Sequence, residues 1–167
     1  MSALFLDEAD VRQLLTMDLA LEAVTAAHRA HGSGQAVDVP RQRTRVPTAA
    51  LHILQGALPD EGVFGYKAYT TSREASRFLV HLFDAANGRL LAMVEADYLG
   101  MMRTGAAGGL AASLLARTDA ATVGIFGAGW QARGQLDALC RVRPVRQVRV
   151  SSRDPARCQA FCDEMTR

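Results

Sequence analysis

A glycine-rich turn between an apolar run and a helical stretch is the feature that most constrains this fold. Residues 121–126 (ATVGIF) form an apolar run typical of a buried parallel strand. A G-x-G-x-x-A motif follows at once and forms the glycine-rich start of a helical pattern over residues 127–142. The motif consists of Gly127, Ala128, Gly129, Trp130, Gln131 and Ala132. A strand, a glycine-rich turn and a helix in this order predict the first half of a Rossmann unit.

The residue types in this turn suit a dinucleotide. Gly127 permits the tight turn, Gly129 lets a pyrophosphate approach the backbone, and Ala132 is small enough for close packing of helix and strand. The unpaired N–H groups at the start of the helix favour an anion. We therefore predict that residues 121–153 hold the pyrophosphate of NAD or NADP.

The end of the second strand carries the information about which dinucleotide binds. A strand is predicted over residues 145–150, and its tip reads Ser151-Ser152-Arg153, without the carboxylate that usually holds the ribose hydroxyls of NAD. Ser152 and Arg153 are therefore candidate cofactor-binding residues, with NADP(H) favoured and NAD(H) possible. Asp154 is better explained as the N-cap of a last helix that begins at Pro155 and runs to Thr166.

The first 118 residues show a different pattern. A short strand is expected over residues 3–6, Asp7 is expected to cap the helical turn that follows, and an amphipathic helix is expected over residues 17–31. Five strands are predicted, at residues 41–46, 50–54, 63–70, 77–83 and 90–95, with a hairpin signal at Asn87-Gly88. A helix rich in Ala and Gly follows over residues 99–116. This α/β pattern predicts a substrate domain over residues 1–118 and a partial Rossmann domain (βαβα) over residues 119–167.

Composition excludes several partners. The net charge is only +2, and no apolar run is long enough for a membrane span, so neither a nucleic-acid nor a membrane partner is expected. The start of the chain lacks the features of a signal peptide, which predicts a cytoplasmic protein. Three cysteines argue against a disulfide framework, and Cys158 and Cys162 are interpreted as small apolar residues rather than as a metal pair. No metal site is predicted.

One lysine stands out among the basic residues. Of 19 basic residues, all but Lys67 are arginine. Lysine can lose its proton when its surroundings lower its pKa, and arginine cannot. Lys67 is therefore a candidate for proton transfer, although a chance surface lysine is the alternative.

Five motifs occur in the order seen in the ornithine cyclodeaminase/mu-crystallin family, which this chain resembles over essentially its whole length. They are PRQRTRV (40–46), GYKAYT (65–70), LFDAANGRLLA (82–92), MRTGAA (102–107) and VGIFGAGWQA (123–132). The resemblance implies a split α/β substrate domain that dimerises through its sheet, followed by a Rossmann domain. It also implies a small amino-acid or imine substrate and a homodimer.

The resemblance assigns roles to individual residues. Arg41, Lys67 and Arg103 match family residues that line the substrate pocket and hold its carboxylate, and Thr104 matches a residue that contacts the cofactor. Two guanidinium groups suit a carboxylate, and a lysine beside them would have its pKa lowered by like charge and burial. Arg43 shares a strand face with Arg41 and is a second candidate.

Three activities are compatible with this pattern. The first is hydride transfer between NAD(P) and a small amino acid or its cyclic imine, with Lys67 handling protons. The second is ornithine cyclodeamination, which is disfavoured because ornithine cyclodeaminases carry a carboxylate at the position aligned with His52. The third is a crystallin-like binding protein or an inactive remnant.

The length of the chain differs from that of the family. Family members are about twice as long, and the second half of the Rossmann domain, with a catalytic aspartate, has no counterpart in this sequence. The first Rossmann strand would then lack a neighbour on one side, and an open apolar strand edge favours aggregation. The sequence alone therefore suggests a fragment or a truncated product.

Overall fold

The computed structural model describes residues 2–73 and 76–166. Its internal contacts divide the chain into two compact units. The first unit comprises Met1–Leu15 and Ala26–Gly100, and the second comprises Thr16–Thr25 and Met101–Arg167. Each unit contains one sheet.

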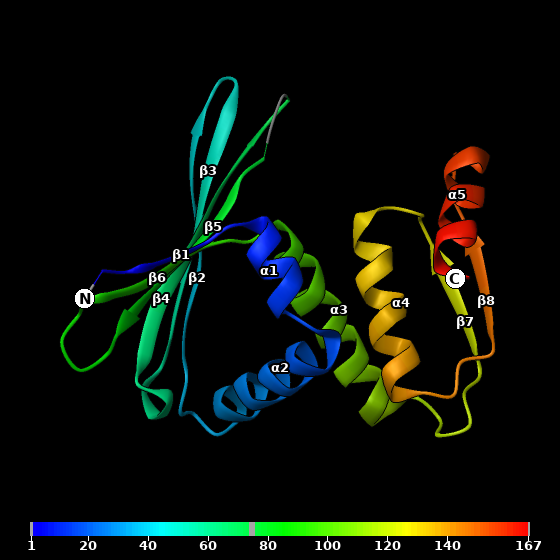
Figure 1. The fold of residues 1–167 in the computed structure, drawn as a ribbon, viewed down its shortest axis with the longest axis horizontal. Coiled ribbons are helices and arrows are strands. Elements are labelled where there is room, and N and C mark those ends of the chain that lie inside the picture. Colours follow the sequence, from blue (N-terminus) through cyan, green and yellow to red (C-terminus); the bar gives the residue numbers. More distant parts are fainter. Residues whose placement is uncertain (1, 74–75, 167) are drawn as a thin grey trace. The chain divides into compact units, whose positions relative to one another are not determined.

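The first unit is built on a mixed six-stranded sheet (Figure 1). Its strands are β1 (Leu4–Leu6), β2 (Val37–Val46), β3 (Ala49–Leu58), β4 (Val63–Ser72), β5 (Phe78–Asp84) and β6 (Leu90–Glu95). They lie in the order β1-β6-β5-β4-β3-β2, and all neighbours are antiparallel except β1 and β6. The predicted turn at Asn87-Gly88 joins β5 to β6, with Gly88 at a φ of 71°.

The register of the strands gives the sheet two chemically different faces. His52 pairs with Tyr69, and Lys67 pairs with Leu54 and Val80, so these side chains share one face. The other face carries aromatic rings, among them Phe64, Tyr66 and Phe83, which stack with centroids 5.5 Å (Phe64–Phe83) and 6.1 Å (Tyr66–Phe83) apart. We call these the Lys67 face and the aromatic face.

Strand β2 contains a bulge just before its arginines. The pairing of β2 with β3 shifts between Val39 and Gln42, as expected of a bulge, and Pro40 lies within it. Because β2 is an edge strand, the missing N–H of Pro40 costs no ladder hydrogen bond there. The strand therefore begins at Val37, four residues before the predicted start at residue 41.

Local side-chain contacts define the helix starts of the first unit. Helix α1 (Glu8–Leu14) begins with a capping box in which Asp7 and Asp10 bond each other's backbone N–H groups. The carboxylate of Glu8 accepts hydrogen bonds from the N–H groups of Asp97 and Tyr98. Helix α2 (Met17–Gly32), the short 3-10 helix η1 (Pro59–Glu61) and α3 (Asp97–Leu115) complete the elements before residue 116. The predicted cap at Asp7 is confirmed.

The second unit contains the predicted βαβα sequence. Its elements are β7 (Thr122–Phe126), α4 (Trp130–Val142), β8 (Gln147–Ser151) and α5 (Pro155–Met165). β7 and β8 pair in parallel. Ala132, Leu136 and Phe161 form a buried cluster, against which Ile125 and Val150 of the strands pack. A partial Rossmann fold is thus confirmed.

Glycines let α3 and α4 approach each other closely in the second unit. A Cβ added to Gly105 would lie 2.1 Å from the carbonyl oxygen of Gly134, and one added to Gly108 would lie 2.1 Å from Oε1 of Gln135. This packing explains why residues from Met101 onward cluster with the second unit. The contact-based division does not follow the boundary expected after residue 118, which stays a prediction about domains.

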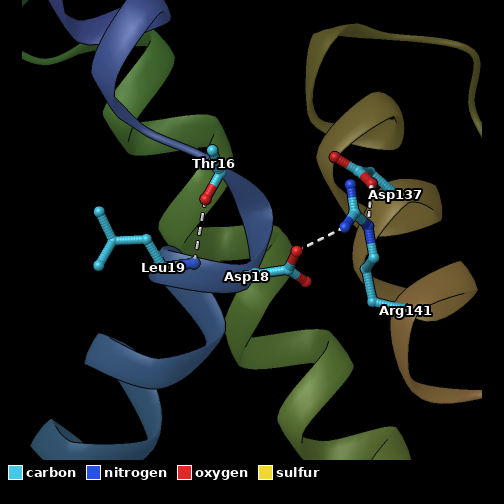
Figure 2. A network of polar contacts seen from close by, with 5 residues as sticks. All are labelled: Thr16, Asp18, Leu19, Asp137 and Arg141. Atoms are coloured by element: carbon cyan, nitrogen blue, oxygen red, sulfur yellow. Dashed lines mark hydrogen bonds and ion pairs between the residues drawn. The ribbon is translucent and has the colours of Figure 1, made fainter.

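A polar network joins the first turn of α2 to α4 in the same unit (Figure 2). Nη1 of Arg141 lies 2.6 Å from Oδ2 of Asp18, and its Nε lies 3.4 Å from Oδ1 of Asp137. The hydroxyl of Thr16 accepts a hydrogen bond from the N–H of Leu19 and so caps the start of α2. Among the described residues, no helix is both long and apolar enough to cross a membrane.

Candidate functional site

Lys67 lies on β4, and its side chain extends from the Lys67 face of the first sheet. Its Nζ lies 4.8 Å from the ring centroid of Phe78 and 6.0 Å from that of Tyr69. A Cβ added to Gly100 would lie 3.2 Å from this Nζ, so the glycine leaves room for the ammonium group. Lys67 is partly buried. An amine held against two aromatic rings is a cation–π arrangement that also shields it from water.

Arg41 reaches the same ring from the neighbouring edge of the sheet. Its Cζ lies 5.9 Å from the ring centroid of Tyr69. Tyr69 itself stacks on Phe78, with centroids 4.9 Å apart. The structure therefore brings two of the predicted substrate residues, Arg41 and Lys67, to one aromatic ring.

His52 is the buried polar residue of this face, with 9% of its surface exposed. Its ring stacks on Tyr69, and its Nε2 lies 3.0 Å from Oγ1 of Thr71. Its Nδ1 is buried and has no hydrogen-bond partner among the described residues. Burial, followed by the charges of Arg43, Arg41 and Arg45, lowers the pKa of His52. The lowered pKa favours the neutral form of the His52 imidazole, which lies beside the arginines of β2.

A pocket of about 600 Å³ opens beside Lys67 within the first unit. Its wall is mostly apolar, with Leu54, Val80 and Leu82 from the sheet. His28 and His31 of α2 also line it. A volume of this size is typical of a small-molecule site.

The dinucleotide turn has the predicted geometry. Gly127 has a φ of 100°, a conformation that favours glycine, and its N–H donates to the carbonyl oxygen of Ser151 at 2.7 Å. Gly129 is the N-cap of α4 and provides no side-chain cap. A Cβ added to Gly129 would meet no atom within 4 Å, so the space in front of the helix end is open. These residues fit a pyrophosphate.

Two side-chain contacts hold the turn and its helix. Arg133 forms a bidentate pair with Glu164 of α5 at 2.7 and 2.5 Å, and its Nη1 lies 3.4 Å from the carbonyl oxygen of Gly129. The hydrogen bond from Arg133 lowers the pKa of the Glu164 carboxyl. Nε2 of Gln135 donates to the carbonyl oxygen of Thr104 at 3.0 Å, which links α4 to α3.

The residues expected to determine the preference for NADP(H) or NAD(H) lie at the end of β8. Ser151 ends the strand, and Ser152 and Arg153 follow it, with Arg153 exposed. Oδ1 of Asp154 accepts hydrogen bonds from the N–H groups of Ala156 and Arg157, at 3.0 and 3.2 Å. The carboxylate is therefore used as a helix cap, as predicted.

The remaining predicted residues belong to the second unit. Arg103 and Thr104 lie on α3, where Arg103 is exposed and Thr104 is partly buried. Their predicted roles rest on the motif alone.

Tyr69, the ring that Arg41, His52 and Lys67 share, was missed by the sequence analysis. The two-residue spacing from Lys67 on a strand could have placed it on the same face. No group of three His, Cys, Asp or Glu residues that could hold a metal occurs in the described part of the chain.

Comparison with known proteins gives one consistent family. The model of the ornithine cyclodeaminase/mu-crystallin family matches residues 1–167. An uncharacterized cyclodeaminase of Sinorhizobium fredii is 33% identical over 177 residues, which cover 96% of this chain and 52% of that protein. The chain spans about half the length of the curated relatives that match along its whole length.

Solved structures of known enzymes have the same fold as this chain over nearly its whole length. A Thermococcus litoralis Δ1-pyrroline-2-carboxylate reductase in complex with NADH and L-proline has a TM-score of 0.91 at 31% identity, over 98% of this chain and 53% of that one. An archaeal alanine dehydrogenase dimer with bound NAD has a TM-score of 0.94 at 30% identity, over 99% and 53% of the two chains.

Proposed function

This chain belongs to the ornithine cyclodeaminase/mu-crystallin family, and from that premise we propose that it serves nicotinamide-dependent hydride transfer on a small amino acid or its cyclic imine. The observation that carries the proposal is the meeting of Arg41 and Lys67 at the ring of Tyr69, where Lys67 also lines a pocket of small-molecule size. A guanidinium can bind the substrate carboxylate, and a shielded amine can give or take a proton at the nitrogen of an imine.

The residues of the first unit have distinct roles in this proposal. Arg41 binds the carboxylate and so orients the imine carbon. Lys67, held against Phe78, donates a proton to the imine nitrogen in reduction and accepts it in the reverse reaction. Arg103 is proposed as a second carboxylate ligand, on the strength of its MRTGAA motif.

The turn at residues 127–132 is proposed to bind the pyrophosphate of a nicotinamide dinucleotide, which when bound supplies or accepts the hydride. Gly127 makes the tight turn, Ala128 and Gly129 present backbone N–H groups at the start of α4, and Thr104 is proposed as a further contact. Trp130, Gln131 and Ala132 continue the motif into the helix.

A preference for NADP(H) over NAD(H) is the finer part of the cofactor proposal. Arg153 is exposed at the strand tip and can meet a 2′-phosphate, while the nearby carboxylate of Asp154 is used as a cap. The two solved relatives described above carry NADH and NAD, so this preference would be a difference from them. Tenfold or tighter binding of NADH than of NADPH would contradict it, a difference of about 1.4 kcal/mol.

A fluorescence titration tests cofactor binding directly. Trp130 is the only tryptophan and is the first residue of α4, next to Gly129. Binding of NADPH should therefore quench Trp130 and transfer energy to the reduced nicotinamide. Gly129→Val should abolish the signal by filling the space in front of the helix, and Gly124→Ala, whose Cβ also meets no atom within 4 Å, is the matched control.

Turnover is tested by the oxidation of NADPH in the presence of carboxylate-bearing imines, with cyclic monocarboxylic imines and imino dicarboxylic acids both included. We expect Lys67→Ala to lower the rate by about 100-fold or more, the usual contribution of a positioned acid or base. An unchanged rate would overturn the role of Lys67. Cofactor binding without turnover on any imine or amino acid would favour a crystallin-like binding protein instead.

We also propose that the chain forms a homodimer through the aromatic face of its first sheet. Phe64 is 41% exposed and Phe5, on the same face, is 56% exposed. Large exposed apolar side chains on one sheet face are typical of a protein interface. Sedimentation should show a dimer for the unaltered chain and a monomer for Phe64→Arg. The cytoplasmic location expected from the sequence stays a prediction.

A further inference from the structure

Strand β2 carries more positive charge to the Lys67 face than one carboxylate requires. Arg43 pairs with His52 and Arg45 pairs with Ala50, so both side chains share a face with His52. Arg41 reaches Tyr69 on that face. Together these residues place three guanidinium groups around one buried imidazole, and Lys67 approaches the Tyr69 ring that stacks on it.

The charges of the three β2 arginines are not balanced by ion pairs among the described residues. None of Arg41, Arg43 and Arg45 forms an ion pair with any residue between 2 and 73 or between 76 and 166. All three side chains are exposed and can turn without disturbing the sheet. A positive site of this kind attracts an anion and repels an ammonium group.

His52 adds an unsatisfied polar atom to this cluster. If the hydroxyl of Thr71 donates to Nε2, then Nδ1 carries the imidazole proton. That N–H has no partner among the described residues, and a buried donor without a partner is costly. A carboxylate drawn to Arg43 could accept this hydrogen bond, because Arg43 lies directly opposite His52 on the neighbouring strand.

We infer that the substrate of this site carries a second carboxylate, on its side chain, which binds Arg43 and His52. The inference rests on the proposed function, in which Arg41 and Lys67 serve the α-carboxylate and the imine nitrogen. The substrate class is then an amino or imino dicarboxylic acid. A diamine such as ornithine is excluded, because its distal ammonium would lie among arginines.

A matched pair of ligands separates this inference from its alternatives. Malate and 2-hydroxybutyrate have the same four-carbon chain and differ in that malate has a second carboxylate where 2-hydroxybutyrate has a methyl group. Calorimetric titration of the chain should show malate binding about tenfold tighter or more, because only malate can add a charge-assisted hydrogen bond at the second carboxylate. Ornithine should show no measurable binding.

Two arginine variants locate the effect. Arg43→Gln should remove most of the preference for malate. Arg89→Gln makes the same change of charge at an exposed position in the β5–β6 turn and should keep the preference. Thermal melts of both variants check that the fold is retained. His52→Gln should weaken malate binding in the same direction as Arg43→Gln.

The outcomes are distinct from those of the proposed function. Three results would overturn the inference: equal affinities for the two hydroxy acids, absence of malate binding, or tighter binding of ornithine than of malate. This holds whatever the Trp130 fluorescence titration shows about NADPH binding. A preference for malate that Arg43→Gln leaves intact would also overturn the assignment to Arg43. Loss of the NADPH signal with a retained malate preference would instead overturn the cofactor part of the proposed function.

Discussion

The imidazole ring of His52 lies flat against the phenol ring of Tyr69, with 4.4 Å between centroids and 2° between planes. The two residues are direct partners across β3 and β4. Because Arg41 and Lys67 approach the same phenol ring, the stack connects the buried histidine to the proposed substrate residues. It also fixes the orientation of the imidazole, so that one ring nitrogen meets Thr71.

The first prediction concerns the titration of His52. Arg43→Gln should raise the pKa of His52 in an NMR titration of its ring protons, because one of the charges that oppose protonation is removed. The pKa should stay below its ordinary value, since burial is the largest cause of the shift. Arg89→Gln should leave it unchanged. A fall in the pKa after Arg43→Gln would show that the electrostatic argument is wrong.

The same shift predicts how stability depends on pH. The pKa of His52 is lower in the folded chain, so the unfolded chain binds more protons once the pH falls below the ordinary histidine pKa of about 6.5. The free energy of unfolding should therefore decrease as the pH falls through that value. Urea denaturation at several pH values should show a smaller decrease for His52→Gln. An equal decrease in both proteins would assign the effect to other groups.

The third prediction concerns the contact of α3 with α4. Gly105→Ala should destabilise the chain by about 1–3 kcal/mol, because its Cβ would lie 2.1 Å from a backbone oxygen that cannot move alone. Alanine is the better helix former by about 1 kcal/mol, but this gain does not remove the clash. Urea denaturation measures the loss, and Gly124→Ala is the control. Unchanged stability would mean that the helices can separate at little cost.

The fourth prediction concerns the start of α5. Asp154→Ala removes the acceptor of two backbone hydrogen bonds and should cost about 1 kcal/mol of stability. Asp154→Asn keeps an acceptor and should cost much less. If both variants lose the same amount, the negative charge of Asp154 would matter more than the cap.

The fifth prediction concerns the network around Arg141. A double-mutant cycle of Asp18→Asn and Arg141→Gln should give a coupling of roughly 0.2–1 kcal/mol, the usual range for exposed ion pairs. Both side chains are substantially exposed, so added salt should reduce the coupling. A coupling that is insensitive to salt would indicate a packing contribution rather than a charge contribution.

Local chemistry allowed much of this fold to be predicted. Asp7 and Asp154 both cap helices through their own side chains, and such caps depend on residues only two or three positions away. The turn at Gly127 is local in the same way, because a φ of 100° calls for glycine. These features could be read directly because the residue types that determine them lie within a few positions of one another in the sequence.

Features that depend on pairing between distant residues were not predictable. The pairing of His52 with Tyr69 requires the register of two strands, and no local pattern states that register. The first long strand was predicted to begin at residue 41, whereas β2 begins at Val37 and accommodates Pro40 in a bulge. The close approach of Gly105 to Gly134 likewise joins residues 29 positions apart in sequence.

That approach also restricts how related sequences can diverge. Any replacement of Gly105 adds a Cβ that meets the backbone of Gly134, and any replacement of Gly134 adds a Cβ 2.8 Å from the carbonyl oxygen of Met101. Neither glycine can be replaced alone by a larger residue while the helices keep this spacing. Descendants of this sequence should either retain both glycines or change them together with a shift of the helix pair, which would appear as correlated substitution at these two sites.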